Sequence, residues 1–151
     1  MVPFDGRFGV RNLQLDVNFG KRAYLPAEEK LINAPYSDLQ RLKVQIPTLA
    51  LGEILGNKWF MLDDRDEPRD LYDLWSATSR FAVPFEEIAL GHLAKYGYLP
   101  DERSLRTAQN LSKLWEQRLA HQVFPLPDFE SVLAELKTAF EEWRTSSETT
   151  I

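Results

Sequence analysis

The chain has 151 residues, about the length of one domain, and 44% of them are hydrophobic, which is enough to bury a core. It contains no cysteine, so disulfide bonds and thiolate metal sites are excluded. The net charge of −5, without a long stripe of lysine and arginine, argues against nucleic-acid binding through bulk electrostatics. No apolar run approaches the roughly 18 residues of a membrane span, and the N-terminus lacks a signal-peptide core. We therefore expect a cytoplasmic protein.

The first third of the sequence carries strand-like alternation. Residues 13–17 alternate between apolar and polar side chains, which predicts a strand with one buried face and places Asp16 on the other face. By itself, such an aspartate is most simply a solvent-exposed residue. A second alternating run over residues 42–46 predicts a strand that stops at Pro47. The polar stretch 27–36 between the two predicts a loop or a short irregular helix.

The remainder of the sequence has helical periodicity. Apolar stripes and capping residues predict five helices, over residues 51–62, 68–80, 84–97 and 101–121 and from the N-cap Asp128 to about residue 143. We divide the chain into a sheet region over residues 1–48, a helical bundle over residues 49–145 that shares the same core, and a polar tail over residues 146–151 that should fray.

Lys58 is the residue that most needs an explanation. Its spacing from Leu51, Leu55 and Leu62 places it on the helical stripe that should face the core, where an ammonium group requires a partner. Asp70 and Asp73 stand one turn apart on the next predicted helix, so the lysine and two carboxylates could meet in one cleft. The alternative is a structural ion pair that joins two helices, with the Lys58 ammonium at the surface.

The order of these residues resembles a known family. The run Glu53-Ile54-Leu55-Gly56-Asn57-Lys58, then Asp64-Arg65, then Pro68-Arg69-Asp70-Leu71-Tyr72-Asp73-Leu74 is similar to the downstream signature of the AbiEii/AbiGii family. These are nucleotidyltransferase-like toxins of bacterial abortive-infection and toxin–antitoxin systems. The resemblance extends upstream to residues 13–19 and implies an α+β chain, in which a partial nucleotidyltransferase-type β-sheet over residues 1–48 precedes a bundle of about five helices.

The resemblance also implies a reaction and a set of roles. The reaction is transfer of a nucleotide from a Mg²⁺-bound nucleoside triphosphate to an acceptor, with RNA such as tRNA as the expected acceptor. Asp16 is then the metal ligand, and Lys58 neutralises the charge of the triphosphate. Asp70 positions that lysine or acts as a base, while Arg69 and Asp73 complete the binding of the nucleotide.

One departure from the family pattern limits this expectation. The family begins with a Gly-rich turn and an Asp-x-Asp pair, and neither precedes Asp16. The segment 6–9 fits no phosphate-binding fingerprint and is better explained as a turn joining two strands. We therefore expect a downstream portion of a nucleotidyltransferase-like protein, with little activity from this chain alone.

A noncatalytic role is the alternative, in which the chain is a protein-interaction module that binds an antitoxin-like partner. The free edge of the predicted strand over residues 13–17 also suggests a homodimer or a complex with another chain. Residues 1–10, which alternate on a strand period, are the competing cover for that edge within one chain.

Overall fold

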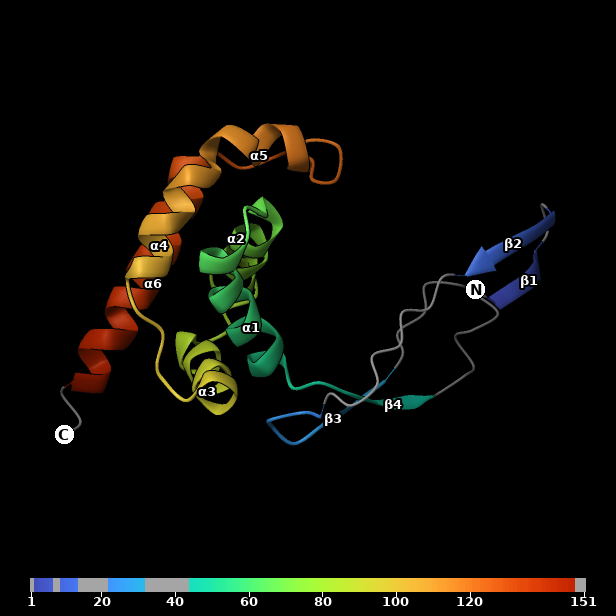
Figure 1. The fold of residues 1–151 in the computed structure, drawn as a ribbon, viewed down its shortest axis with the longest axis horizontal. Helices are drawn as coiled ribbons and strands as arrows, with labels where there is room; N and C mark the ends of the chain where they lie inside the picture. Colours follow the sequence, from blue (N-terminus) through green and yellow to red (C-terminus); the bar gives the residue numbers. More distant parts are fainter. Residues whose placement is uncertain (1, 7–8, 14–21, 32–43, 149–151) are drawn as a thin grey trace.

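A computed structural model describes residues 2–6, 9–13, 22–31 and 44–148 of the chain (Figure 1). Short strands precede a helical bundle, so the α+β class expected from the sequence is confirmed. In chain order the elements are β1 (Val2–Gly6), β2 (Gly9–Leu13), β3 (Glu28–Leu31), β4 (Gln45–Thr48), α1 (Leu51–Asp64), α2 (Pro68–Trp75), the π-helical turn η1 (Ser76–Arg80), α3 (Phe85–Tyr96), α4 (Arg103–Ala108), the 3-10 turn η2 (Gln109–Leu111), α5 (Ser112–Leu119) and α6 (Phe129–Glu148).

The described strands form two separate antiparallel pairs. β1 pairs with β2, with Gly6 opposite Gly9, so the expected turn between two strands at this point is confirmed. This pairing joins residues 2–6 to residues 9–13 in one hairpin, and whether residues 1–10 cover the predicted strand over residues 13–17 stays a prediction. Of the predicted strand over residues 13–17, only Leu13 is described, and it pairs with Val2. The rest of the predicted strand, including Asp16, lies outside the described residues.

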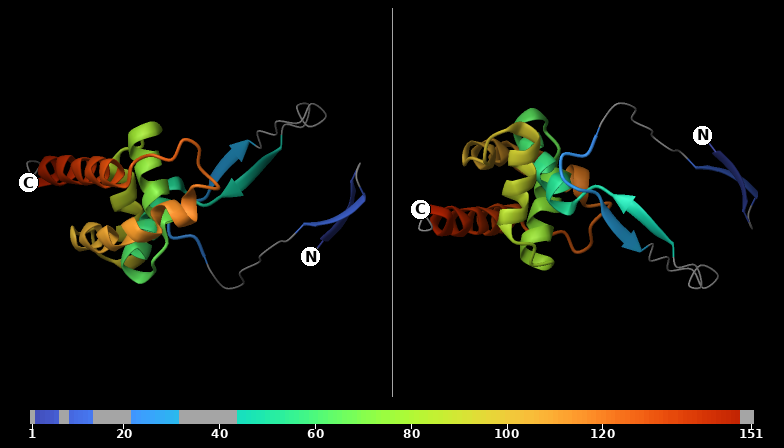
Figure 2. Two further views of the ribbon diagram at one scale, coloured as in Figure 1. Left: turned by 90° about the horizontal axis from the view of Figure 1, so that it is seen from above. Right: turned by 90° about the horizontal axis from the view of Figure 1, so that it is seen from below.

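The pair formed by β3 and β4 corrects two expectations. Residues 28–31 form a strand where a loop or an irregular helix was expected, because they pair with β4. β4 continues through Pro47, where a strand end was expected. Proline is tolerated because a two-stranded sheet has only edge strands, and an edge strand can spare one N–H donor. The side chains of both strands are exposed or half-exposed, and Figure 2 shows the pair projecting from the start of α1.

Three details of the helices differ from the expected pattern. The run over residues 68–80 is one helix that changes from α to π geometry at Ser76. The helix expected over residues 101–121 is broken by η2 into α4 and α5, which point in different directions in Figure 1. α6 begins where expected, because the Asp128 carboxylate accepts the N–H of Ser131 (2.9 Å), and it remains helical to Glu148. Counting continuous runs, the described residues contain the expected five helical segments.

The fully buried side chains of the described core come from the helices and helical turns. Trp59 of α1 is fully buried and lies between Phe85 of α3 (ring centroids 5.1 Å apart, edge to face) and Phe140 of α6 (5.5 Å, stacked). Leucines of α1, α2, α4, α5 and α6 close around these rings. Whether the sheet region shares this core, as the expected division of the chain has it, stays a prediction. No helix in this part of the chain is long and apolar enough to cross a membrane.

α1 and α3 are in direct backbone contact. A Cβ atom built on Gly91 of α3 would lie 1.9 Å from the carbonyl oxygen of Gly52, and one built on Gly56 would lie 2.3 Å from the backbone nitrogen of His92. Glycine is the residue that permits such an approach. His92 is buried in this contact and its Nδ1–H donates to the carbonyl oxygen of Tyr98 (2.9 Å). Burial lowers the pKa of His92, so the ring is neutral and donates through this nitrogen.

The glycine contact makes a prediction about stability. We expect Gly91→Ala to destabilise the protein by more than about 2 kcal/mol, because the new methyl group must push α1 and α3 apart. Gly97→Ala is the matched control. Gly97 ends α3 with φ of 80° and has open space around it, so only the backbone strain of about 1 kcal/mol applies. Urea unfolding of both variants measures the difference, and equal losses would show that the helices tolerate a wider separation.

Candidate functional site

Lys58 meets both predicted carboxylates. It lies in the middle of α1, and its ammonium nitrogen is 3.1 Å from Asp70 Oδ1 and 2.7 Å from Asp73 Oδ2. The two aspartates fall on the same side of α2 because they are three residues apart. The Lys58 side chain keeps 22% of its surface exposed, so its charged end lies at the boundary between core and solvent. The expected meeting of the lysine with both carboxylates is therefore present, while the catalytic roles assigned to these residues stay predictions.

Asp70 is the buried member of this cluster. Its side chain is only 1% exposed and stands in the first turn of α2, where a carboxylate is stabilised by the positive end of the helix. The sequence fixes this helix start well. Pro68 occupies the first helical position, and Glu67 accepts the backbone N–H of Arg69 (3.4 Å) as the N-cap.

Arg65 is a second cation on Asp70, and the sequence reasoning did not assign it to the site. Its Nε lies 2.9 Å from Oδ2 and its Nη2 lies 3.1 Å from Oδ1, so the guanidinium contacts both carboxylate oxygens. The position of Arg65 in the sequence could have pointed to this role. An arginine in the short turn before a helix that carries a buried aspartate in its first turn is well placed to reach that aspartate.

The electrostatic balance of the cluster favours the charged forms of both cations. For Lys58, burial lowers the pKa, but the hydrogen bonds and charges of Asp73 and Asp70 outweigh burial and leave the pKa raised. The hydrogen bond and charge of Asp70 also raise the pKa of Arg65. The raised pKa therefore favours the charged ammonium form of Lys58 at the protein surface.

The remaining predicted site residues are Arg69, Asp73 and Asp16. Arg69 is exposed, and its backbone N–H donates to the Glu67 carboxylate, as described above. Asp73 is 37% exposed and contacts Lys58 directly, as described. Asp16, the predicted metal ligand, lies outside the described residues. Within the described part of the chain, no group of three or more acidic or histidine side chains could hold a metal ion. These residues do not make a Mg²⁺ site by themselves, and the expected Mg²⁺ stays a prediction.

Two further polar residues of α1 make contacts that the sequence reasoning missed. Glu53 is 4% exposed, and its Oε2 accepts the backbone N–H groups of Tyr24 (2.8 Å) and Leu25 (3.0 Å), which ties the segment before β3 to the helix. Asn57 Oδ1 accepts hydrogen bonds from Lys95 and from the Tyr96 hydroxyl (2.8 Å), which joins α1 to α3. A carboxylate at a buried helix position needs donors, and backbone N–H groups supply them here.

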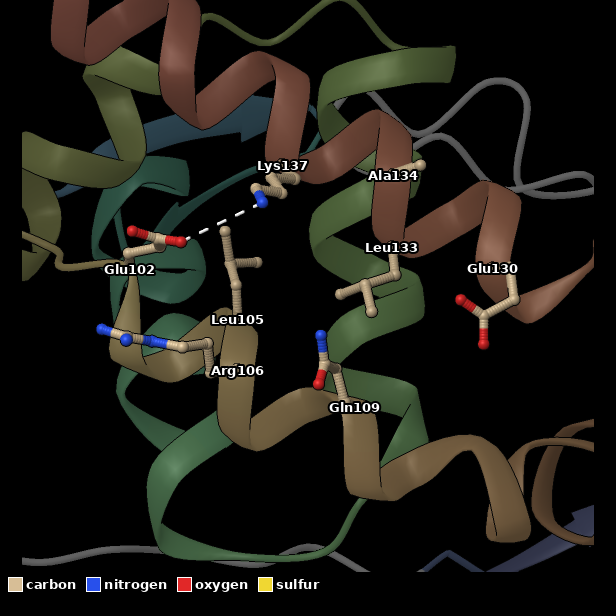
Figure 3. A pocket seen from close by; sticks show the side chains of 8 residues that line it. All are labelled: Glu102, Leu105, Arg106, Gln109, Glu130, Leu133, Ala134 and Lys137. Carbon is tan, nitrogen blue, oxygen red and sulfur yellow. Dashed lines mark ion pairs between the residues drawn. The ribbon is translucent and has the colours of Figure 1, made fainter.

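The cavities of the described structure lie elsewhere. Figure 3 shows one of about 150 Å³ between α4 and α6, where Leu105 and Leu133 form apolar walls and Lys137 reaches to 4.0 Å from Glu102. It is smaller than a typical ligand pocket. A larger hollow of about 570 Å³ lies between Tyr72 and Trp75 and the loop over residues 122–127. Neither is lined by Lys58, Asp70 or Asp73, so the cluster is a surface site between α1 and α2.

A family model described as "Nucleotidyl transferase AbiEii toxin, Type IV TA system" matches residues 6–143. The chain belongs to the AbiEii family. No curated protein and no solved structure was found to match it. Because the family match spans the whole of α1 and α2, it includes Lys58, Arg65, Asp70 and Asp73. The resemblance read from residues 53–74 is therefore confirmed.

Membership in the AbiEii family makes this protein a nucleotidyltransferase-like toxin of a type IV toxin–antitoxin system, and the family suggests an antitoxin as partner. In the helical part of this AbiEii chain, Lys58 pairs with Asp70 and Asp73, and Arg65 pairs with Asp70.

Two matched substitutions compare how much the buried and the exposed aspartate contribute to the stability of the protein. We expect Asp70→Asn to destabilise the protein by about 2 to 4 kcal/mol, because it removes charged hydrogen bonds to Lys58 and Arg65 at a buried position. Asp73→Asn breaks a pair with the same lysine, but at a carboxylate that is 37% exposed, and should cost below about 1 kcal/mol. Denaturant unfolding of the two variants is the measurement. A cost at Asp73 equal to that at Asp70 would contradict this account of burial.

Proposed function

We propose that this AbiEii chain supplies the lysine of a nucleotidyltransferase site, with Lys58 binding the phosphates of a nucleoside triphosphate whose nucleotide is transferred to an acceptor. The observation that carries the proposal is the geometry of Lys58. Its ammonium is held at 3.1 Å and 2.7 Å from two aspartates while part of its side chain stays exposed. A charged ammonium that stays partly exposed at the protein surface is suited to bind phosphoryl oxygens.

The proposal gives each neighbouring residue a task. Asp70 and Asp73 orient the Lys58 side chain so that its ammonium projects from between α1 and α2. Arg69, on the turn that carries Asp70, is exposed and able to reach the same ligand. RNA, with tRNA as the first to test, is the acceptor that the family resemblance favours. The role given to Lys58 does not depend on a bound metal ion, and Asp16 is the residue proposed to hold Mg²⁺ when transfer occurs.

Triphosphate binding tests the role of Lys58. We expect nucleoside triphosphate to bind more weakly to Lys58→Met by on the order of tenfold, equivalent to 1.4 kcal/mol, because one charged contact is lost. Lys113→Met is the matched control, since it removes an exposed lysine of α5. Isothermal titration measures both variants against the wild type. Equal binding by Lys58→Met and the wild type would refute the role proposed for Lys58.

The transfer step is tested separately with labelled nucleoside triphosphates, Mg²⁺ and total tRNA. Because the chain shows neither a Gly-rich turn nor an Asp-x-Asp pair before Asp16, we expect it to transfer little or no label by itself. Robust incorporation that disappears in Asp16→Ala would contradict that expectation and would show that one sheet carboxylate is enough.

A second candidate function is a noncatalytic interaction module, and the surface around the strands favours it. Six aliphatic side chains along β3, β4 and the start of α1 are more than a third exposed, namely Leu31, Val44, Ile46, Leu49, Leu51 and Ile54. Among the described strands, β3 and β4 pair only with each other, which leaves open hydrogen-bonding edges. Exposed apolar groups beside an open strand edge favour association with another polypeptide. An antitoxin or a second copy of the chain fits this surface.

The apolar surface predicts association in solution. In the absence of another partner we expect light scattering at micromolar concentration to give about twice the 17.5 kDa mass of one chain. Ile46→Lys places a charge on the exposed edge strand and should return the protein to a monomer. A wild-type protein that stays monomeric at every concentration tested would exclude the homodimer and leave a different partner to be sought.

A further inference from the structure

Arg65 makes most of the side-chain hydrogen bonds to the buried Asp70 carboxylate. Its two nitrogens contact both oxygens at 2.9 and 3.1 Å, whereas Lys58 contacts only Oδ1, at 3.1 Å. A two-point arginine–carboxylate pair is stronger and more fixed in geometry than a single ammonium contact. If Lys58 moved away, Asp70 would therefore keep a cation and two of its three side-chain hydrogen bonds.

The two aspartates differ in what happens when Lys58 leaves. Asp73 is 37% exposed, so water can hydrate its carboxylate. Asp70 is 1% exposed and has no such access. A buried carboxylate left without a cation is strongly unfavourable, and the cost would hold Lys58 in place. Arg65 removes this cost because its contact with Asp70 does not involve Lys58.

Arg65 is also fixed independently of the lysine. It stands in the short turn between α1 and α2, where its backbone N–H donates to the carbonyl of Met61 (3.0 Å) and its own carbonyl accepts the N–H of Glu67 (3.0 Å). Its side chain is 53% exposed, so the guanidinium reaches Asp70 from the solvent side. A movement of the Lys58 side chain leaves all of these contacts intact.

We propose that Arg65 is a positioning residue that keeps Asp70 charge-balanced, so that Lys58 can leave both aspartates and bind the phosphates of a nucleoside triphosphate. The proposal rests on the phosphate-binding role given to Lys58 above and adds how that lysine becomes available. Arg65 acts through Asp70 and does not touch the ligand.

The experiment follows the Lys58 side chain by NMR in protein labelled with ¹³C at the lysine ε-carbon, with inorganic tripolyphosphate as the probe. The Lys58 signal is identified by its loss in Lys58→Arg. We expect tripolyphosphate to bind Arg65→Gln more weakly than the wild type by on the order of tenfold, although Lys58 is present in both. Arg103→Gln is the matched control, because Arg103 pairs with an aspartate that is 51% exposed, and its affinity should equal that of the wild type.

A second pair of variants decides whether Arg65 acts through Asp70 and remains informative if Arg65→Gln fails to fold. In Asp70→Asn no buried carboxylate remains to be balanced. Adding Arg65→Gln to Asp70→Asn should therefore change the tripolyphosphate affinity by no more than roughly threefold, the size of a screened charge effect at the surface. A loss of tenfold or more in this background would show that Arg65 contacts the anion itself, which would overturn the proposal.

The remaining outcomes separate this inference from the proposed function. If tripolyphosphate shifts the wild-type Lys58 signal and Arg65→Gln binds as tightly as the wild type, the inference about Arg65 is wrong and the role of Lys58 stands. If tripolyphosphate leaves the wild-type Lys58 signal unchanged at every concentration, both are wrong. Weaker binding by Arg65→Gln together with equal binding by Asp70→Asn and its Arg65→Gln double variant supports the proposal.

Discussion

The contact between the backbones of α1 and α3 is the constraint on which the rest of the structure depends. Gly52, Gly56 and Gly91 allow the two helices to touch without intervening side chains, which fixes the rotation of α1. Because one side of α1 packs against α3, Trp59 points into the core and Lys58 points toward α2. The observed orientation of α1 thus serves the core, through Trp59, and the ion cluster, through Lys58.

The sequence predicted the ion cluster better than it predicted the strands. Helical period places Lys58 on the stripe expected to face the core, where an ammonium needs a partner, and the spacing of Asp70 and Asp73 puts both carboxylates on one side of the next helix. Local geometry was therefore sufficient to predict that the three side chains meet. Arg65 was missed as a site residue because its conformation is set by a turn, and turn geometry is not encoded in a simple period. The break at η2 was missed because the apolar spacing continues through it.

The strands show why the remaining structure was harder to predict. Residues 28–30 are charged and residues 28–31 have no strand-like alternation, and they form a strand because β4 pairs with them. The paired positions lie 14 to 20 residues apart in the sequence, from Leu31 with Gln45 to Glu28 with Thr48, and such pairing is a tertiary effect that single-sequence patterns do not contain. The same applies to Glu53, whose partners are the backbone N–H groups of residues 24 and 25. Its burial could be suspected from the helix, but its partners could not.

The unequal burial of the two aspartates would let one cluster serve both stability and the proposed binding of phosphate. Asp70, with its two cations, joins the turn before α2 to the middle of α1 and so contributes to the fold. Asp73 orients the exposed end of Lys58 and is itself open to water. In the proposed role, a phosphate would displace Lys58 from a solvated aspartate, where ion pairs are weak, and from a buried aspartate that keeps its contact with Arg65. The packing of the helices would then be retained while the lysine changes partner, which is what the proposed phosphate-binding role of Lys58 requires.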